Sequence, residues 1–513
     1  MNIVSFSPFG YEGALVHVDV DVRRGIPAVD MVGLADGAVK ESRERMRSAI
    51  RNSGFEFPPE RVLISLSPAD LRKEGAGFDL AVALAVLQAQ SCAQTDTVPS
   101  DEQVLVMGEL ELNGNVRPVR GIYAAVTTAL EAGIHKCIIP HANKEEACGI
   151  SGMQVFGADS LREAFKVLTD ESCFSAQTEQ QNQNDDLVQF APYSSSEDYA
   201  LIQGQEQLLR ALQIAAAGGH NLLAFGPPGC GKTLALQRFY TLLPLLTSQE
   251  AQSVTRIHSI AGLLSPGTTL IRTPPFRQPH QSASLEGLCG GGSHCMPGEI
   301  SLAHNGVLFL DEAAEFRSSV LQMMRVPLET GSITLSRAGR ATTYPSRFQL
   351  LMATNPCPCG AFGSKDKLCL CSSHSIEQYW KKFSGPLLDR IDIRIHVQSK
   401  TESNSSYTVS TEQLRKPIAS AVHRQRTRQH IRNAQLTIAQ IEQFCTCTEG
   451  AKDALEKAAE TYSFSARAKS SCLKLARTIA DMEEKDTICT EHVTEAIDLR
   501  KTEGGLNWDF LEE

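Results

Sequence analysis

Short apolar runs and helical stretches alternate along the first third of the chain. Residues 62–66 and 136–140 are apolar runs with the length of strands, whereas residues 79–88 and 122–132 repeat apolar positions with the period of a helix. Alternation of this kind is typical of domains that pack helices against a sheet. We therefore predict a mixed α/β domain over residues 1–172.

The alternation stops between residues 175 and 196, where glutamine, asparagine and serine replace the apolar residues. No hydrophobic period survives there, so we interpret residues 173–198 as a linker. A helical stretch at 203–217, an apolar run at 221–225 and a glycine-rich loop then follow in the order in which P-loop folds begin. This order predicts a second α/β domain over residues 199–400, and continued helical periodicity predicts a small α-helical lid over residues 401–513.

Composition narrows the class of protein and its surroundings. The chain of 513 residues carries a net charge of -10 and has no apolar run of about 18 residues that could span a bilayer. Its N-terminus lacks the basic and long apolar segments of a secretory signal, so we expect a cytoplasmic protein without a membrane partner. In a reducing compartment the 15 cysteines are expected to be thiols or metal ligands. Any nucleic-acid site must be a local basic patch in this acidic chain.

A P-loop directly follows the apolar run at 221–225. Its backbone N–H groups can contact phosphate oxygens, while Lys232 reaches the β and γ phosphates and Thr233 holds Mg²⁺. The alternative, a chance match in a loop, is disfavoured because a strand precedes the motif and a helical run follows it. The sequence thus predicts ATP as a ligand, bound by Gly226, Pro227, Pro228, Gly229, Cys230, Gly231, Lys232 and Thr233.

Two apolar strands further along end in residues suited to phosphate hydrolysis. Residues 306–310 lead into Asp311 and Glu312, which we assign to Mg²⁺ binding and to general-base activation of water, respectively. The alternative is that both acids only begin the next helix, where negative charge favours the helix dipole. Residues 350–354 lead into Asn355, whose side-chain amide is suited to orient the attacking water.

Arg390 and Arg467 are candidates to stabilise charge on the γ-phosphate during its transfer. Arg390 lies at a helix end before another apolar strand, and Arg467 opens a helix of the predicted lid. Structural arginines that pair with nearby acids are more common, and the residues alone favour that interpretation for both.

A predicted hairpin at residues 329–347 carries Arg337 and Arg340 at its tip. No acidic residue occurs at 330–365, so the stretch is a local cationic site, and we predict that both arginines contact DNA phosphates. The alternatives are a solvated hairpin and one that contacts a neighbouring subunit. A second basic stretch, at 415–432, is interpreted as a solvated helix of the lid.

Two CxC pairs, Cys357/Cys359 and Cys369/Cys371, lie close together in the chain. Four thiolates at close spacing suit tetrahedral Zn²⁺, and we predict a structural zinc site. The alternative is packing beside Asn355, because CxxC is the more usual chelating pair.

Several longer segments together resemble one protein family. They are residues 215–222 (AAAGGHNL), 275–280 (PFRQPH), 297–306 (PGEISLAHNG), 355–360 (NPCPCG) and 476–481 (ARTIAD). Residues 199–500 resemble the magnesium-chelatase-like branch of AAA+ ATPases, and the chain as a whole resembles the YifB/ComM family.

The resemblance implies an ATP hydrolase that works as a homohexameric ring with each ATP at a boundary between subunits. It implies that Arg390 acts across that boundary as an arginine finger and that Arg467 is a second sensor. In this branch the hairpin that carries Arg337 and Arg340 points into the pore of the ring. ComM-like function further implies helicase or branch-migration activity on single-stranded or branched DNA, alongside recombination proteins, during natural transformation.

Three positions depart from the family or fold that the chain resembles. Cys230 stands where the family usually has Thr or Ser, which leaves phosphate binding to the backbone but exposes a thiol to oxidation. Residues 73–79 and 108–121 resemble the Lon-protease-type fold found at the start of this family. By that alignment Gly77 and Tyr123 occupy the positions of the Ser nucleophile and the Lys base, so we expect no proteolysis.

Two functions of different class stay open on the sequence. The first is a DNA-translocating ring motor. The alternative is an ATPase that remodels a protein partner, as the magnesium chelatase motor does. The long first domain and the arginine-tipped hairpin favour the DNA motor.

Overall fold

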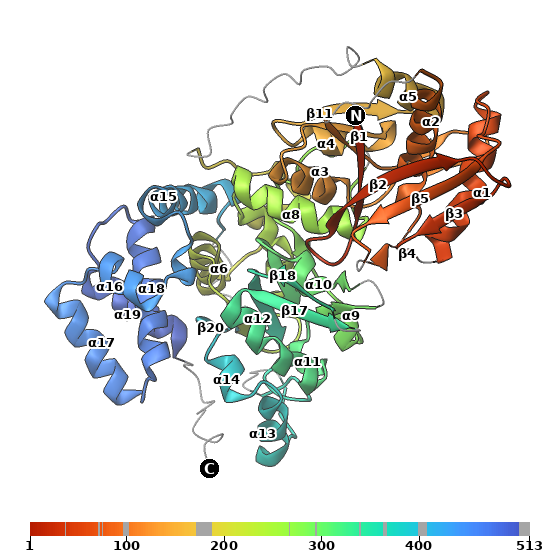
Figure 1. The fold of residues 1–513 in the computed structure, drawn as a ribbon. Helices are drawn as coiled ribbons and strands as arrows, with labels where there is room; N and C mark the ends of the chain where they lie inside the picture. The colour runs from red at the N-terminus through yellow and green to blue at the C-terminus, as the bar shows by residue number, and fades with distance from the viewer. Residues whose placement is uncertain are drawn as a thin grey trace.

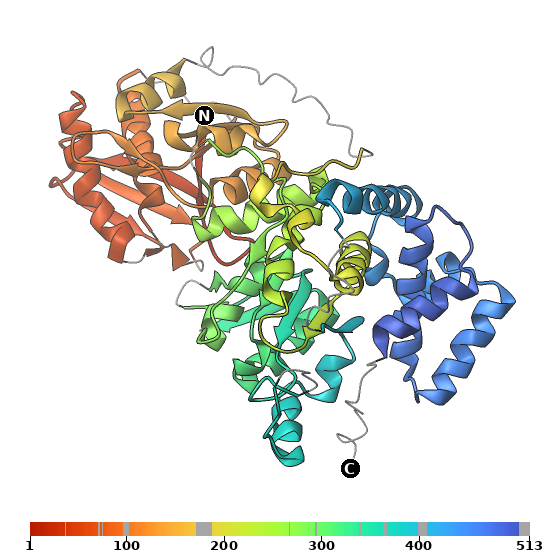
Figure 2. The ribbon, with the colours of Figure 1, turned by 180° about the vertical axis from the view of Figure 1, so that it is seen from behind.

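The structure, a computed structural model, describes residues 1–35, 37–69, 72–73, 75–95, 102–170, 187–265, 267–292, 295–337, 340–362, 367–398 and 408–501. Figure 1 shows a sheet domain coloured red to orange at the start of the chain, a central domain in green and a helical domain in blue. The view from behind in Figure 2 agrees that the first and last of these lie on different sides of the central one. The α/β fold class predicted from the sequence is confirmed.

A seven-stranded mixed sheet organises the first domain, in the order β11-β10-β7-β1-β2-β5-β3. Successive side chains of a strand point to opposite faces, so Ile3 of β1 packs in the core under α1, α2 and α5, whereas Val4 and Phe6 pack in the core under α3. The strands are β1 (Asn2–Ser7), β2 (Ala14–Arg23), β3 (Val29–Val32), β5 (Arg61–Ser67), β7 (Gln103–Val106), β10 (Lys136–Pro140) and β11 (Gln154–Ala158), with short pairs β4 (Leu34–Ala35) and β6 (Arg72–Lys73), and β8 (Glu109–Leu110) and β9 (Val116–Arg117). The helices are α1 (Gly37–Asn52), α2 (Asp79–Thr95), α3 (Ile122–Glu131), α4 (Lys144–Cys148) and α5 (Leu161–Thr169).

A five-stranded parallel sheet forms the centre of the second domain, in the order β13-β16-β19-β12-β20. Because all five strands are parallel, residues that follow a strand lie at one edge of the sheet, and residues that precede a strand lie at the opposite edge. The candidate site residues described below lie at these two edges. The strands are β12 (Leu222–Phe225), β13 (Phe276–Arg277), β16 (Val307–Leu310), β19 (Gln349–Thr354) and β20 (Ile393–His396).

Helices and two small antiparallel ribbons surround this sheet. The helices are α6 (Glu206–Gly218), α7 (Lys232–Gln237), α8 (Ser248–Ala261), α9 (Leu285–Cys289), α10 (Glu299–Leu302), α11 (Ser318–Met323), α12 (Arg325–Thr330), α13 (Ser373–Lys381) and α14 (Gly385–Leu388). The ribbons pair β14 (Gly290–Gly291) with β15 (Met296–Pro297), and β17 (Ser332–Arg337) with β18 (Arg340–Pro345).

The lid consists of α15 (Thr411–Gln429), α16 (Ile438–Phe444), α17 (Glu449–Thr461), α18 (Ala466–Met482) and α19 (Thr490–Arg500). It shares one hydrophobic core with α6 and the central sheet. Arg428 of α15 pairs with the buried Asp481 of α18 at 2.7 Å, and Arg424 contacts the same carboxylate. The predicted solvated basic helix is therefore wrong at these positions, because the two arginines hold α15 to α18.

Residues 187–198, within the predicted linker, pack against the central domain and the lid. Phe190 forms a β-bridge with Pro244. The guanidinium of Arg415 lies 4.9 Å from the ring centroid of Phe190 and 4.7 Å from that of Tyr193. Phe190 and Tyr193 therefore hold the C-terminal part of the predicted linker against the rest of the protein.

The loop after β1 joins the first domain to the central one. The N–H of Tyr11 donates to Thr342 Oγ1 of β18 at 3.0 Å, and its ring meets Tyr344 edge to face at 5.9 Å. Arg256 of α8 lies over the same ring, 4.7 Å from its centroid. The first domain thus contacts the base of the β17–β18 hairpin. Among the described residues, no helix combines the length and apolar character needed to cross a membrane.

Candidate functional site

The loop between β12 and α7 has the backbone shape that phosphate binding requires. Gly229 and Gly231 have φ angles of 82° and 90°, in the left-handed region that favours glycine. A Cβ on Gly226 would lie 2.1 Å from the carbonyl oxygen of Val397, so that position has no room for a side chain. These constraints explain the glycines and leave successive backbone N–H groups free to face an anion.

Lys232 is held within the curve of this loop. Its Nζ donates to the carbonyl oxygens of Gly226 and Pro227 at 2.7 and 2.8 Å, and burial lowers its pKa below the usual range. Phosphate oxygens can replace these carbonyl oxygens as acceptors. Cys230 is only 4% exposed, so the expectation that its thiol is open to oxidation is wrong.

Thr233, in the first turn of α7, and Asp311, directly after β16, meet at the carboxyl edge of the sheet. Thr233 Oγ1 donates to Asp311 Oδ1 at 3.0 Å. A hydroxyl and a carboxylate oxygen are ligands of the hard type that Mg²⁺ prefers, and their proximity fits one shared ion. The residues present therefore fit the metal predicted from the sequence.

Glu312 adopts a left-handed backbone conformation with φ 49° and ψ 47°. A non-glycine residue held there costs about 1 to 3 kcal/mol and marks functional sites. The turn ends the strand at once and places Glu312 on the wall of a cavity of about 590 Å³ together with Asn355. The general base and the amide predicted from separate strands thus face one space.

Side chains without a role predicted from the sequence also line this cavity. They are His280, Gln281, Ser282, Glu315, Arg317 and Tyr379. His280 and Gln281 follow β13, and Arg317 precedes α11. His280 lies in the 275–280 segment that carries the family resemblance, which was the available signal. Arg317 stands in no such segment.

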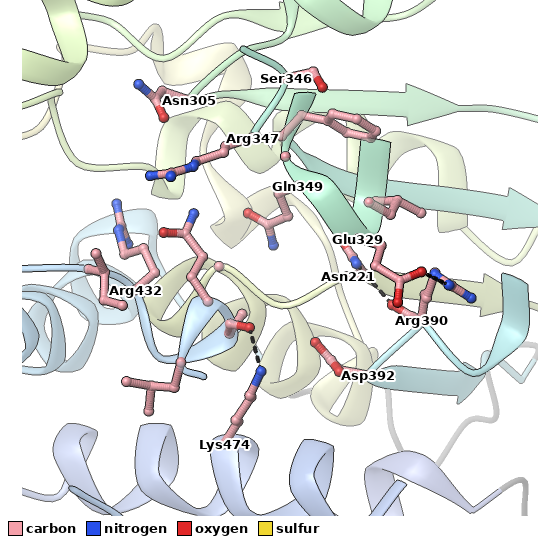
Figure 3. A pocket seen from close by; sticks show the side chains of 18 of the residues that line it. Asn221, Asn305, Glu329, Ser346, Arg347, Gln349, Arg390, Asp392, Arg432 and Lys474 are labelled. Carbon is pink, nitrogen blue, oxygen red and sulfur yellow. Dashed lines mark hydrogen bonds and ion pairs between the residues drawn. The ribbon is translucent and has the colours of Figure 1, made fainter. Parts of the chain in front are cut away.

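A second cavity, of about 660 Å³, opens between the central domain and the lid, at the opposite edge of the sheet (Figure 3). Its lining includes residues at or just before the starts of three strands: Asn221 before β12, Gln349 at the start of β19 and Asp392 before β20. Arg390 and Arg467 line it too, whereas the P-loop residues, Asp311, Glu312 and Asn355 are not among its lining residues.

Both arginines converge on one carboxylate at this edge. Arg390 and Glu329, the latter at the end of α12, form an ion pair, and Arg467 of the lid lies 3.5 Å from the other carboxylate oxygen. The hydrogen bond from Arg390 holds the pKa of the Glu329 carboxyl below its usual range. Figure 3 shows the side chains of Glu329 and Arg390 pointing toward each other, joined by the dashed line of their ion pair. The structure brings the two predicted arginines together.

The two edges lie too far apart for Arg390 to reach the P-loop of its own chain. The side chain of Asn221 donates to the carbonyl oxygen of Arg390, at the amino end of β12, and Gly226 follows the carboxyl end of the same strand. The five residue steps from Asn221 to Gly226 span about 17 Å at roughly 3.3 Å per residue. An arginine side chain is shorter than that distance, so Arg390 does not reach its own P-loop.

The hairpin places Arg337 and Arg340 opposite each other on β17 and β18, at the end where the two strands join. Residues 338–339 of the turn lie outside the described residues. The base of the hairpin is anchored, because Tyr344 is buried and its hydroxyl donates to the carbonyl oxygen of Cys295 at 2.9 Å. The predicted β-hairpin is therefore confirmed, with both arginines on its distal half.

The cysteines of both CxC pairs meet after β19. The sulfur atoms of Cys357, Cys359, Cys369 and Cys371 all lie within 4.8 Å of one another. The structure thus brings together residues that are up to 14 positions apart in the chain.

The positions aligned with a protease dyad carry no such pair. Gly77 lies in a single turn between β6 and α2, and Tyr123 is buried in α3 with its N–H bonded to Glu146 at 2.8 Å. Gly77 has no side chain to act as a nucleophile and Tyr123 has no amine to act as a base, and the absence of peptidase activity stays a prediction.

Families described as magnesium chelatase subunit ChlI match most of the chain. Residues 198–405 match the family "Magnesium chelatase, subunit ChlI", residues 18–143 match "Subunit ChlI of Mg-chelatase", and residues 408–500 match "Magnesium chelatase, subunit ChlI C-terminal".

Two relatives match over nearly their whole length. YifB of Escherichia coli is 40% identical over 496 residues, which cover 96% of this chain and 95% of YifB. Competence protein ComM of Haemophilus influenzae is 37% identical over 507 residues, which cover 97% of each chain. An archaeal Lon protease of Thermoplasma volcanium is 33% identical over 98 residues, 18% of this chain and 14% of the protease.

Proposed function

The chain belongs to the YifB/ComM family of magnesium-chelatase-like AAA+ proteins, and from this premise we propose that it is an ATP-driven ring motor that moves DNA. The observation that carries the proposal is that the P-loop, Asp311, Glu312 and Asn355 follow strands at the carboxyl edge of the central sheet, whereas Arg390 and Arg467 line a cavity at the amino edge. A ring brings the amino edge of one subunit onto the carboxyl edge of the next.

The carboxyl edge binds the nucleotide and prepares water. Lys232 exchanges its two backbone carbonyl acceptors for oxygens of the β and γ phosphates. Thr233 and Asp311 hold Mg²⁺, which neutralises charge on the phosphates when bound. Glu312 accepts a proton from the attacking water, and Asn355 orients that water from across the shared cavity.

The amino edge of the neighbouring subunit supplies the remaining positive charge. Arg390 and Arg467 leave Glu329 and contact the γ-phosphate, whose charge grows during transfer. The γ-phosphate therefore competes with Glu329 for both arginines. In this scheme Arg467 acts across the boundary together with Arg390, since both line the same cavity in one subunit.

The hairpin provides the grip on DNA. Arg337 and Arg340 lie on paired strands in a stretch without acidic residues, and they contact phosphates without reading sequence. The contact between Tyr11 and the hairpin base links the first domain to that grip. Helicase or branch-migration activity of a homohexamer on single-stranded or branched DNA, with recombination proteins in natural transformation, is the function we propose.

A protein-remodelling ATPase is the second candidate. It is favoured by the match of residues 198–405 and 408–500 to magnesium chelatase families. The same catalytic groups serve it, so only the response to DNA separates the two.

ATP turnover with and without single-stranded and forked DNA, at about 50 and 200 mM salt, tests the proposal. We expect salt-sensitive stimulation by DNA that Arg337→Ala/Arg340→Ala removes while basal turnover persists. The matched variant Arg24→Ala/Arg51→Ala removes the same charge from exposed positions of the first domain and should leave the stimulation intact. No effect of DNA at either salt concentration would favour the protein-remodelling ATPase.

A further inference from the structure

The four cysteines after Asn355 form a cage with the dimensions of a zinc site. Their sulfur atoms are separated by 3.4 Å (Cys357 to Cys359), 3.7 Å (Cys357 to Cys369) and 3.6 Å (Cys359 to Cys369). Thiolates bound to Zn²⁺ at about 2.3 Å stand about 3.8 Å apart at the corners of a tetrahedron, whereas a disulfide requires about 2.0 Å. An iron–sulfur cluster would separate its thiolates by the width of the cluster, so a single ion is the better fit.

We propose that Cys357, Cys359, Cys369 and Cys371 bind one Zn²⁺, and that this ion positions Asn355 against the P-loop. The cage and its ion are called the zinc clip below.

Residues 367–371 form the second arm of the zinc clip. This arm is held in place through the sulfur atoms of Cys369 and Cys371. Leu368 and Leu370, on either side of Cys369, are 84% and 86% exposed. Apolar packing therefore does not anchor this arm, although leucines in a packed loop would be expected to face inward. The cysteines are the inward-facing residues, and a shared metal ion gives them a common attachment.

Residues 357–362 form the first arm of the zinc clip. This arm already contains a backbone hydrogen bond to sulfur of the kind that metal-bound thiolates accept. The N–H of Phe362 donates to Cys357 Sγ at 3.3 Å, and Cys357 is fully buried. Bonds of this kind orient a ligand and stabilise its negative charge. A buried sulfur that accepts from the backbone is better suited to a metal than to solvent.

The arm passes close to both Asn355 and the P-loop. A Cβ on Gly360 would stand 3.0 Å from Pro228 Cδ and 3.9 Å from Asn355 Cγ, so the backbone there lies near both side chains. Trp380 Nε1 of α13 donates to the carbonyl oxygen of Pro356 at 3.0 Å. The zinc clip thus ties the loop that carries Asn355 to the residues that begin α13.

A consequence for hydrolysis rests on the proposed function, in which Asn355 orients water. If the ion leaves, the loop that carries Asn355 keeps only its attachment to Trp380, and Asn355 loses its fixed place near the P-loop. Nucleotide binding depends on the P-loop backbone and Lys232, and should be retained. Asn355 is thus the catalytic group and the zinc clip positions it.

Metal content tests the binding claim without reference to activity. Zinc and iron are measured by mass spectrometry in the full chain purified without metal-chelating resin, and in Cys369→Ser/Cys371→Ser. The matched control is Cys445→Ser/Cys447→Ser, which removes a third CxC pair that lies outside the zinc clip. We expect about one zinc per chain in wild type and control and less than about a tenth in the clip variant. Zinc below a tenth in wild type, equal zinc in both variants, or iron in its place would overturn the site.

Wild-type protein, stripped of zinc by a thiol-reactive mercurial and a chelator and then restored to free thiols, tests the positioning claim. We expect turnover to fall about tenfold, binding of a fluorescent ATP analogue to persist, and Zn²⁺ to restore turnover. Unchanged turnover in a zinc-free chain would show that zinc does not position Asn355, but it would not contradict zinc binding by the four cysteines. Absence of turnover in the zinc-loaded chain would contradict the proposed function, while the zinc content would still decide the site.

Discussion

The two edges of the central sheet are built in different ways. At the carboxyl edge each group follows its own strand: the P-loop follows β12, Asp311 and Glu312 follow β16, and Asn355 follows β19. At the amino edge the groups come from α12, from the turn before β20 and from the lid. The first edge is fixed by one sheet, whereas the second depends on how the lid docks. Under the proposed function, nucleotide binding is a property of one subunit and hydrolysis is a property of a pair.

Removal of the arginine at the amino edge should have the largest effect. We expect Arg390→Ala to lower turnover about 10³-fold, the lower end of what an arginine finger contributes. Arg390→Lys should be almost as inactive, because lysine lacks the planar fork that contacts two oxygens. The measurement is turnover beside equilibrium binding of a fluorescent ATP analogue, which should be unchanged. If the isolated variant bound the ATP analogue more weakly than wild type, Arg390 would contact the nucleotide of its own subunit. The proposed difference between the two edges of the sheet would then be wrong.

Loss of the general base at the carboxyl edge should have the next largest effect. We expect Glu312→Gln to lower turnover about 10²-fold and to retain ATP binding, because the amide cannot accept the proton from water. Glu315→Gln removes the same charge from the same cavity and serves as the matched control, with turnover within about twofold of wild type. Equal losses in both variants would show that the charge of the cavity, rather than the position of Glu312, supports hydrolysis.

Removal of the Glu329 carboxylate, which pairs with Arg390 and Arg467, should have a moderate effect. Unlike the first two substitutions, it should favour turnover. Glu329 is 54% exposed, so its ion pairs contribute roughly 0 to 1 kcal/mol. Glu329→Gln should lower the protein concentration for half-maximal turnover by up to about fivefold, because the γ-phosphate no longer competes with a carboxylate. Protein-concentration series of the turnover rate measure this shift. A loss as large as that of Arg390→Ala would make Glu329 part of the hydrolytic machinery instead.

The smallest effect is expected at Cys230. Its side chain is buried and the loop binds phosphate through the backbone, so Cys230→Thr should change nucleotide affinity by less than about twofold. Titration of a fluorescent ATP analogue checks this value. A change above tenfold would mean that the thiol itself supports Lys232, from which it lies 3.6 Å away.

The sequence predicted the carboxyl edge well because each of its groups stands next to an apolar strand. Parallel strands bring such residues together without further information, so Lys232, Asp311 and Asn355 could be placed from spacing. Glu329 could not, since its role depends on the approach of Arg390 and Arg467 from distant segments. The basic face of α15 was misread for the same reason: its partner, Asp481, is 53 residues beyond Arg428.

Complementation between two inactive variants tests most directly whether each site is shared between subunits. Lys232→Ala lacks the carboxyl edge of the site and Arg390→Ala lacks the amino edge, and each alone should hydrolyse almost no ATP. In randomly mixed rings about a quarter of the boundaries would join an intact P-loop to an intact arginine. We predict that mixing the two variants restores turnover to about a quarter of the wild-type rate. Turnover that stays at the level of the separate variants, in rings shown to contain both chains, would contradict a site shared between subunits.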